Sequence, residues 1–166
     1  VLPQQGFDEH AVWRYLQAQL DDFSGPAELR QFQGGQSNPT FLIQTPAKKF
    51  VLRKKPPGKL LPSAHLVERE YRVLRALPST DVPVPAARLL CEDPAIIGTS
   101  FYVMDHVEGR VITGVTLPQL TPPERARVYD DYARIGAALH AVDFRGLGLS
   151  DFGKPGGYIA RQLDRW

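Results

Sequence analysis

The chain has 166 residues, of which 43% are apolar, and its 20 basic and 18 acidic side chains leave a formal net charge of +2. These totals suit one ordinary domain and argue against a disordered chain and against the strongly basic surface of nucleic-acid-binding proteins. The single cysteine, Cys91, cannot form an internal disulfide, which fits a reducing compartment. No long apolar run and no signal-peptide pattern is present. We therefore expect an intracellular, cytoplasmic protein with neither nucleic acid nor membrane as a partner.

The two ends of the sequence suggest a piece of a longer protein. The chain starts at Val1 rather than at a methionine, and Trp166 falls within a predicted helix that has no glycine or proline stop signal. We expect further sequence beyond Trp166.

The first predicted element is a helix that Asp8 can cap. Apolar residues recur after it at three- and four-residue spacing, at Val12, Leu16, Leu20 and Phe23. The breaker sequence Ser24-Gly25-Pro26 marks its end.

The next stretch, residues 28–53, predicts a small antiparallel meander. Its strand-like runs cover residues 28–33, 40–44 and 50–53. The first two are joined by the turn in QFQGGQSNPTFL, residues 31–42, which is rich in hydrogen-bond donors. This turn could hold a phosphate or could be a plain hairpin, and it is not a Walker motif because no Gly-Lys-Ser/Thr follows.

Six basic residues cluster near the third strand, at positions 48, 49, 53, 54, 55 and 59. The simplest interpretation of such a run is a solvated strand end. Strand alternation places Phe50, Leu52 and Lys54 on one face, and Val51, Arg53 and Lys55 on the other.

A second helix is predicted over residues 64–77, and Glu70 is its most informative residue. At about 100° per residue Glu70 lies about 40° from Leu66, inside the apolar arc, whereas Glu68 lies at about 200° and should face outward. A carboxylate on a buried face is costly unless a cation or several donors meet it. The sequence therefore predicts a partner for Glu70, the alternative being that its side chain reaches the rim of the face.

The remaining elements follow in chain order. We expect an extended linker over residues 82–85, strands over residues 87–91 and 100–104, and a turn over residues 105–109 that leaves the sheet. Thr121-Pro122-Pro123-Glu124 is a capping box that opens a long helix to about Ala141, followed by a glycine-rich loop.

Three of these features fit one chemistry. A glycine-bearing turn offers backbone donors, a strand then ends in a cation, and the next helix carries an inward carboxylate, which is the order found in a kinase nucleotide lobe. Arg53 or Lys54 is the expected partner of Glu70. We favour Arg53, because it directly follows the apolar run and because a guanidinium can contact a carboxylate and a phosphate together.

Other site classes find no support in the sequence. The four histidines lack a second ligand at zinc spacing, no Gly-x-Ser-x-Gly elbow is present, and Gly146-Leu147-Gly148 fails the dinucleotide fingerprint. Cys91 is expected to be a core residue.

The motifs GGQSNPTF, FVLRKKPPG, HLVEREYRVLRAL, VPVP and FYVMDHVEGR occur in this order. Together they resemble the aminoglycoside phosphotransferase and choline kinase-like family, small-molecule relatives of the protein kinases. FVLRKKPPG with GYIARQLDRW is similar to the branch associated with acyl-CoA dehydrogenases. The resemblance runs from about residue 28 onward.

The resemblance implies an α+β, protein-kinase-like fold. Residues 1–27 would form an N-terminal helix, residues 28–104 an antiparallel-sheet nucleotide-binding lobe with one main helix, and residues 105–109 the hinge. Residues 110–166 would begin a mostly helical C-terminal lobe that is incomplete in this chain.

The resemblance also implies roles at the site. Gly34, Gly35, Gln36, Ser37 and Asn38 would form the flap over the ATP phosphates. Arg53 would contact the phosphates and Glu70 would hold it. Met104 would lie beside the adenine, with the backbone of Asp105 and Val107 bonding its edge.

The family's catalytic loop, of the type His-Gly-Asp followed by Asn, and its later magnesium-binding Asp do not occur here. We expect both beyond Trp166, so that no catalytic residue or metal ligand lies in this chain. The resemblance implies transfer of the γ-phosphoryl group of MgATP to a hydroxyl of a small molecule, with a hydroxyacyl-CoA as a candidate. The alternatives are a non-catalytic nucleotide-binding module and a plain interaction domain.

Overall fold

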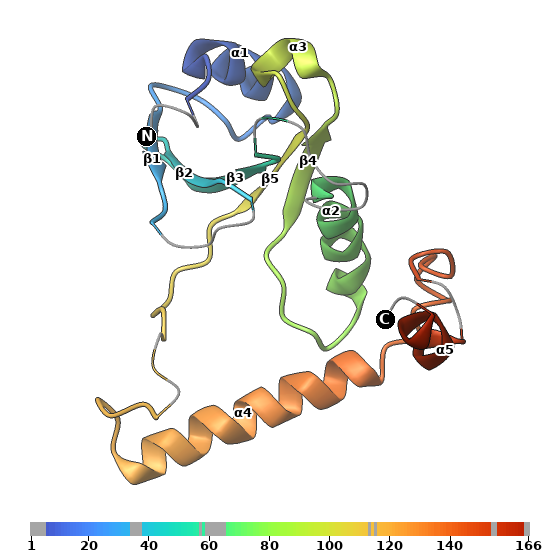
Figure 1. Cartoon of the computed structure of the whole chain (residues 1–166). Coiled ribbons are helices and arrows are strands. Elements are labelled where there is room, and N and C mark those ends of the chain that lie inside the picture. Colours follow the sequence, from blue (N-terminus) through green and yellow to red (C-terminus); the bar gives the residue numbers. More distant parts are fainter. Residues whose placement is uncertain are drawn as a thin grey trace.

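The fold is built on one five-stranded antiparallel sheet with strand order β1-β2-β3-β5-β4 (Figure 1). The computed structural model describes residues 6–33, 38–56, 58, 66–112, 114, 116–153 and 156–164. The strands are β1 (Glu28–Gln31), β2 (Thr40–Gln44), β3 (Lys49–Lys54), β4 (Ala87–Cys91) and β5 (Phe101–Asp105). The helices are α1 (Glu9–Gln19), α2 (Val67–Ala76), η2 (Leu77–Ser79), α3 (Pro94–Ile97), α4 (Pro122–His140) and α5 (Tyr158–Leu163).

Helix α1 forms as predicted and packs on the sheet. The side chain of Asp8 accepts a hydrogen bond from the backbone N–H of Ala11 at 3.2 Å, which caps the helix. Val12 and Leu16 are fully buried beneath it. The helix ends at Gln19, earlier than the breaker sequence suggested, and Leu20 and Phe23 join the same core from the segment that follows.

One face of the sheet carries the main hydrophobic core. Phe50 and Leu52 of β3 point into it, together with Phe41 and Ile43 of β2. Helices α1 and α3 cover this face (Figure 1). Burial of these apolar side chains is the main source of stability for the lobe.

The opposite face of the sheet is occupied by α2, which contacts β4 and β5. Along β5, Phe101 and Val103 point into the main core, so that Tyr102 and Met104 point to the second face. This explains why residues 101–104, FYVM, do not alternate between apolar and charged side chains. The fold class is confirmed: the sheet and its helices form a kinase-like N-terminal lobe with a helical segment after it.

The predicted orientation of Glu68 is wrong. Its side chain is 24% exposed and forms an ion pair with Lys55, which directly follows β3. Burial alone would raise the pKa of Glu68, but hydrogen bonds from Lys55, from the backbone and from Ser100 outweigh burial and lower it. The prediction from the helical angle failed because the start of α2 lies beside the end of β3. A residue on the flank of the helix therefore still contacts the sheet.

Helix α4 extends away from the sheet (Figure 1). The predicted capping box is present, and the carboxylate of Glu124 accepts a hydrogen bond from the backbone N–H of Thr121 at 2.8 Å. None of the residues of α4 is buried. Among the helices in the described ranges, none is long and apolar enough to cross a membrane.

Candidate functional site

The predicted pair of Arg53 and Glu70 is present. Arg53, near the end of β3, places its Nε 2.9 Å from Oε2 of Glu70, in the first turn of α2. Both side chains are about one-third exposed, at 33% and 35%. The pair therefore joins the strand to the helix at the edge of an open cleft.

Two further side chains hold the carboxylate of Glu70. The amide Nδ2 of Asn38 donates to Oε1 at 2.8 Å, and the hydroxyl of Tyr102 donates to Oε2 at 3.1 Å. Burial and the nearby Glu70 carboxylate raise the pKa of Tyr102, so its hydroxyl stays a proton donor. Sequence analysis did not identify Tyr102 as a site residue. The only signal for it was strand alternation, which places Tyr102 on the face of β5 opposite Phe101 and Val103.

Asn38 lies at the end of the β1–β2 connection and contacts α2. It is only 6% exposed, and its side chain is directed at Glu70. The backbone carbonyl of Asn38 also accepts a hydrogen bond from the hydroxyl of Thr40 at 3.0 Å. Asn38 therefore anchors the end of the β1–β2 connection to α2, while its contact with phosphate stays a prediction. Gly34, Gly35, Gln36 and Ser37 lie outside the described residues.

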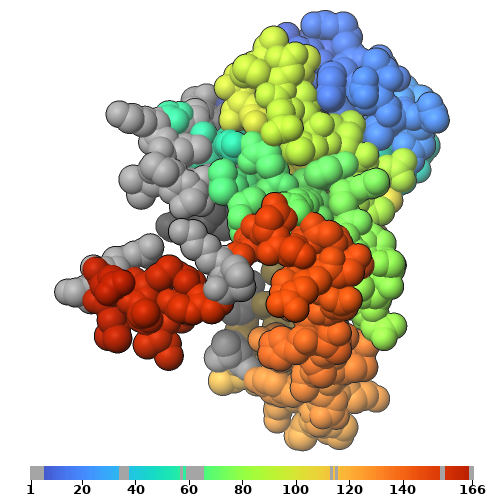
Figure 2. Space-filling model, turned by 90° about the vertical axis from the view of Figure 1, so that its right-hand side faces the viewer, coloured from blue at the N-terminus to red at the C-terminus, as the bar shows by residue number. Residues whose placement is uncertain are grey.

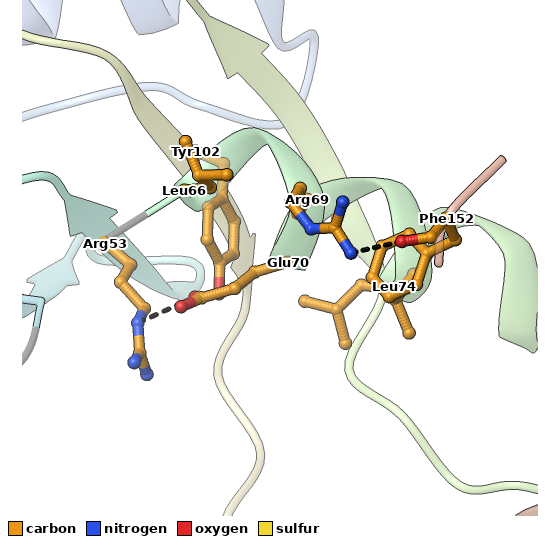
Figure 3. Close-up of a pocket in the computed structure, with 8 residues that line it drawn as sticks. Arg53, Leu66, Arg69, Glu70, Leu74, Tyr102 and Phe152 are labelled. Atoms are coloured by element: carbon orange, nitrogen blue, oxygen red, sulfur yellow. Dashed lines mark hydrogen bonds and ion pairs between the residues drawn. The ribbon is translucent and has the colours of Figure 1, made fainter. Parts of the chain in front are cut away.

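The guanidinium group of Arg53 faces the cleft. Its Nε contacts Glu70 as an ion pair but makes no hydrogen bond, and its two terminal nitrogens point away from Glu70 (Figure 3). The cleft has a volume of about 640 Å³. Its lining is Arg53, Leu66, Arg69, Glu70, Val73, Leu74, Tyr102 and Phe152. A charged ligand in this cleft could reach the outer edge of the guanidinium.

Lys54 does not take the place of Arg53. It lies on the opposite face of β3, is 3% exposed, and holds its ammonium 5.6 Å from the ring centroid of Phe7. Burial lowers the pKa of Lys54. Because consecutive residues of a strand point to opposite faces, Lys54 is excluded as the partner of Glu70.

The other described lysines of the basic cluster form ion pairs with carboxylates of the chain. Lys48 lies 2.9 Å from Asp22 and 3.0 Å from Asp105, and Lys49 lies 2.6 Å from Glu108. Lys55 is bound to Glu68, as described above, and Lys59 lies outside the described residues. The interpretation of this cluster as a solvated strand end is wrong for Lys54, which is buried, but it fits Lys49, whose side chain is 40% exposed.

A second pocket of about 640 Å³ lies where β5 leaves the sheet. Met104, Asp105 and Val107 line it, as the predicted adenine site requires, and so do Phe32 of the β1 end and Val51 of β3. Val51 and Arg53 share one face of β3 and are about 7 Å apart along the strand. One extended ligand can therefore contact both the pocket and the Arg53 cleft.

The backbone of Asp105 can serve this pocket only in part. Its N–H already donates to the carbonyl of Ala86 at 2.9 Å. Asp105 can thus contribute only its carbonyl oxygen to a ligand. The hydrogen-bond donor would have to be the backbone N–H of Val107, a residue that is 66% exposed at the rim of the pocket.

Metal-binding groups do not gather in the part of the chain that the structure describes. No set of three or more His, Cys, Asp or Glu side chains lies close enough there to hold an ion. The predicted magnesium ligands beyond Trp166 stay a prediction.

The sheet, the helix α2 and the Arg53–Glu70 pair define the class: a lobe of the kinase-like phosphotransferase fold. The phosphotransferase enzyme family (APH) matches residues 28–166, and the chain belongs to this family. A crystal structure from Ralstonia eutropha JMP134, of a protein provisionally named an aminoglycoside phosphotransferase, superposes with a TM-score of 0.83 at 45% identity. It matches 97% of this chain and 46% of its own.

Curated relatives carry a different kind of name. Human acyl-CoA dehydrogenase family member 11 is 43% identical over 170 residues, which is 100% of this chain and 22% of that protein. The chicken protein of the same name is 46% identical over 167 residues, or 98% of this chain and 21% of that protein. This chain thus spans about a fifth of the length of these relatives.

Proposed function

We propose that this chain is the nucleotide-binding part of a phosphotransferase that moves the γ-phosphoryl group of MgATP to a hydroxyl of a small molecule. The observation that carries the proposal is the 2.9 Å contact between Arg53 and Glu70, on the face of β3 that also lines the pocket beside β5. In kinase-like enzymes a strand cation held by a helix carboxylate contacts the nucleotide phosphates.

The pocket beside β5 would take the adenine ring. Its apolar lining, from Phe32, Val51 and Met104, suits a flat aromatic ring, and the backbone near Val107 offers edge contacts. Phe32 is 42% exposed, so its ring is accessible for contact.

The phosphates would lie toward Arg53. Its terminal nitrogens would donate to phosphate oxygens while Glu70, fixed by Asn38 and Tyr102, holds the guanidinium in place. Because the guanidinium is oriented before the nucleotide binds, less ordering is needed on binding. Magnesium would supply further neutralisation of the phosphate charge.

The acceptor is proposed to be a hydroxyacyl-CoA. This step is an analogy from the relatives named as acyl-CoA dehydrogenases, with which this chain shares its whole length. The residue that orients the acceptor hydroxyl is expected beyond Trp166. An assay of ADP release tests this acceptor. The full-length natural protein is incubated with MgATP and a 3-hydroxyacyl-CoA, and the ADP formed is measured. ATP binding without transfer to any hydroxyl compound would favour the non-catalytic alternative.

Titration of MgATP by calorimetry tests the nucleotide site. We expect Arg53→Ala to weaken binding by about 10- to 100-fold, because a charge-assisted hydrogen bond contributes about 1.5–3 kcal/mol. Glu70→Gln should also weaken binding, since the guanidinium would no longer be held.

The matched control is Lys55→Ala. Lys55 shares the face of Arg53 by strand alternation and makes its own ion pair to α2, with side chains that are 21% and 24% exposed. Its removal breaks a strand–helix pair but takes away no phosphate contact, so any loss of MgATP affinity should stay below about fivefold, well short of the loss in Arg53→Ala. Equal affinity of the parent and Arg53→Ala proteins would overturn the proposal.

A further inference from the structure

A loop near the C-terminal end of the chain is fastened to α2. Arg72 Nη1 donates to Oδ2 of Asp151 at 2.8 Å, and Nη2 donates to the other carboxylate oxygen and to the carbonyl of Gly148 at 2.6 Å. This is a two-pronged guanidinium–carboxylate contact, which fixes orientation better than a single ion contact. Figure 2 shows the orange-red surface of this segment directly against the green surface of α2.

A second contact lies one turn away on the same helix. The guanidinium of Arg69 donates to the backbone carbonyl of Phe152 and lies 4.0 Å from the centroid of its ring (Figure 3). Residues three apart on a helix are neighbours on its surface, so Arg69 and Arg72 form one docking surface on α2. Glu70 lies between them in sequence on the adjoining face.

The loop itself has a defined shape. Leu149 is 6% exposed, and its backbone N–H donates to the carbonyl of Phe144 at 2.8 Å. Gly148 has φ +71°, a conformation that suits glycine, and the N–H of Phe152 donates to the carbonyl of Leu149 at 2.9 Å. The segment that contacts α2 is therefore a hydrogen-bonded turn.

Helix α2 contributes little to the hydrophobic core. Val67 is its only buried residue, and its N-cap residue, Leu66, makes no capping hydrogen bond with its side chain. The attachment of α2 to the sheet is therefore mainly polar, through the Lys55–Glu68 pair and the contacts to Glu70, and such attachments allow more local movement than a packed apolar face does. The position of Glu70 thus depends on polar contacts, those that the sheet makes to α2 and those that the loop makes to it.

We propose that Arg72 and Asp151 are positioning residues, and that the loop Gly148–Phe152 holds α2 so that Glu70 faces Arg53. In this arrangement the segment after α4 controls the geometry of the phosphate site through α2. The low pKa of Asp151, about 2 because of the hydrogen bond from Arg72, keeps the contact charged at neutral pH. The effect on nucleotide binding rests on the proposed function, whereas the effect on α2 does not.

Hydrogen exchange of the full-length natural protein tests the effect on α2 without nucleotide. We expect Asp151→Asn to increase the exchange rates of α2 amides about two- to fivefold, the range set by the strength of an exposed ion pair, with β2 and β3 unchanged. The matched control is Asp131→Asn, which removes an exposed pair with Arg134, 2.6 Å away on α4. Unchanged α2 exchange in Asp151→Asn would overturn the proposal, as would an equal increase in β2 and β3.

A double-mutant cycle tests whether the loop acts through Glu70. Asp151→Asn should weaken MgATP binding about two- to fivefold in the parent, and should have no further effect once Glu70→Gln is present. A purely structural role would give the same loss in both backgrounds and would contradict the proposal. Failure of the parent to bind MgATP would contradict the proposed function instead, and the exchange experiment would then decide on the loop alone.

Discussion

At the scale of single residues, the carboxylate of Glu70 is held from three parts of the chain: the β1–β2 connection, β3 and β5. Asn38, Arg53 and Tyr102 supply these contacts, and two of them are neutral donors. A carboxylate held on both oxygens cannot rotate freely, so it presents a fixed charge to the guanidinium. The site is therefore more than a single ion pair.

Tyr102→Phe should lower the free energy of unfolding. Tyr102 is 2% exposed, and a hydrogen bond to a charged group is worth about 1.5–3 kcal/mol. Denaturant unfolding measures the change. Tyr71→Phe is the control, because its ring lies 6.2 Å from that of Tyr102 in the same region, and a change within about 0.5 kcal/mol is expected. Equal stability of Tyr102→Phe and the parent would contradict a stabilising hydrogen bond from Tyr102 to Glu70.

Glu70 could be predicted from a local period, whereas the choice of Arg53 also needed the chemistry of its guanidinium group. The helical period placed Glu70 on the inward face of α2, and strand alternation separated Arg53 from Lys54. Tyr102 could not be predicted in this way, because β5 is apolar on both faces and its period carries no signal. Asn38 and Glu70 are 32 residues apart, and such contacts depend on the tertiary fold.

At the scale of elements, α2 connects the two halves of the described chain. It meets β4 and β5 on one side and the loop Gly148–Phe152 on the other. The sequence analysis assigned no role to Arg69 and Arg72, which make the second contact. Their partner Asp151 lies 79 residues away, and no periodicity relates the two positions.

The contact between Arg72 and Asp151 should weaken in acid. Asp151 has a pKa near 2 in the folded chain, below its ordinary value of 3.8, so its contribution to stability is present above about pH 4 and is lost as the pH falls toward 2. The difference in unfolding free energy between the parent and Asp151→Asn should therefore be constant near neutral pH. It should shrink as the pH falls below about 4.

Urea unfolding at a series of pH values measures this difference. High salt should reduce it at neutral pH as well, because the pair is exposed. A difference that grows as the pH falls, or that is the same from neutral pH to about pH 3, would contradict the assigned pair.

At the scale of the whole molecule, the sheet with α1 and α3 has its own core, whereas α4 buries no residue. Several large apolar side chains of the last third are exposed, including Tyr132, Leu139, Tyr158 and Ile159. The sequence predicted the sheet lobe and α4, because each has a strong local period. It could not predict how the segment after α4 returns to α2, which depends on side-chain pairing across the fold.

The measurement that tests the central claim most directly compares two ligands in two proteins. If Arg53 contacts the phosphates, Arg53→Ala should weaken MgATP binding by about 10- to 100-fold and leave adenosine binding at the pocket beside β5 unchanged. Calorimetric titration of both ligands into the parent and Arg53→Ala proteins gives the four dissociation constants. Equal losses for MgATP and adenosine, or none for either, would contradict a phosphate contact at Arg53.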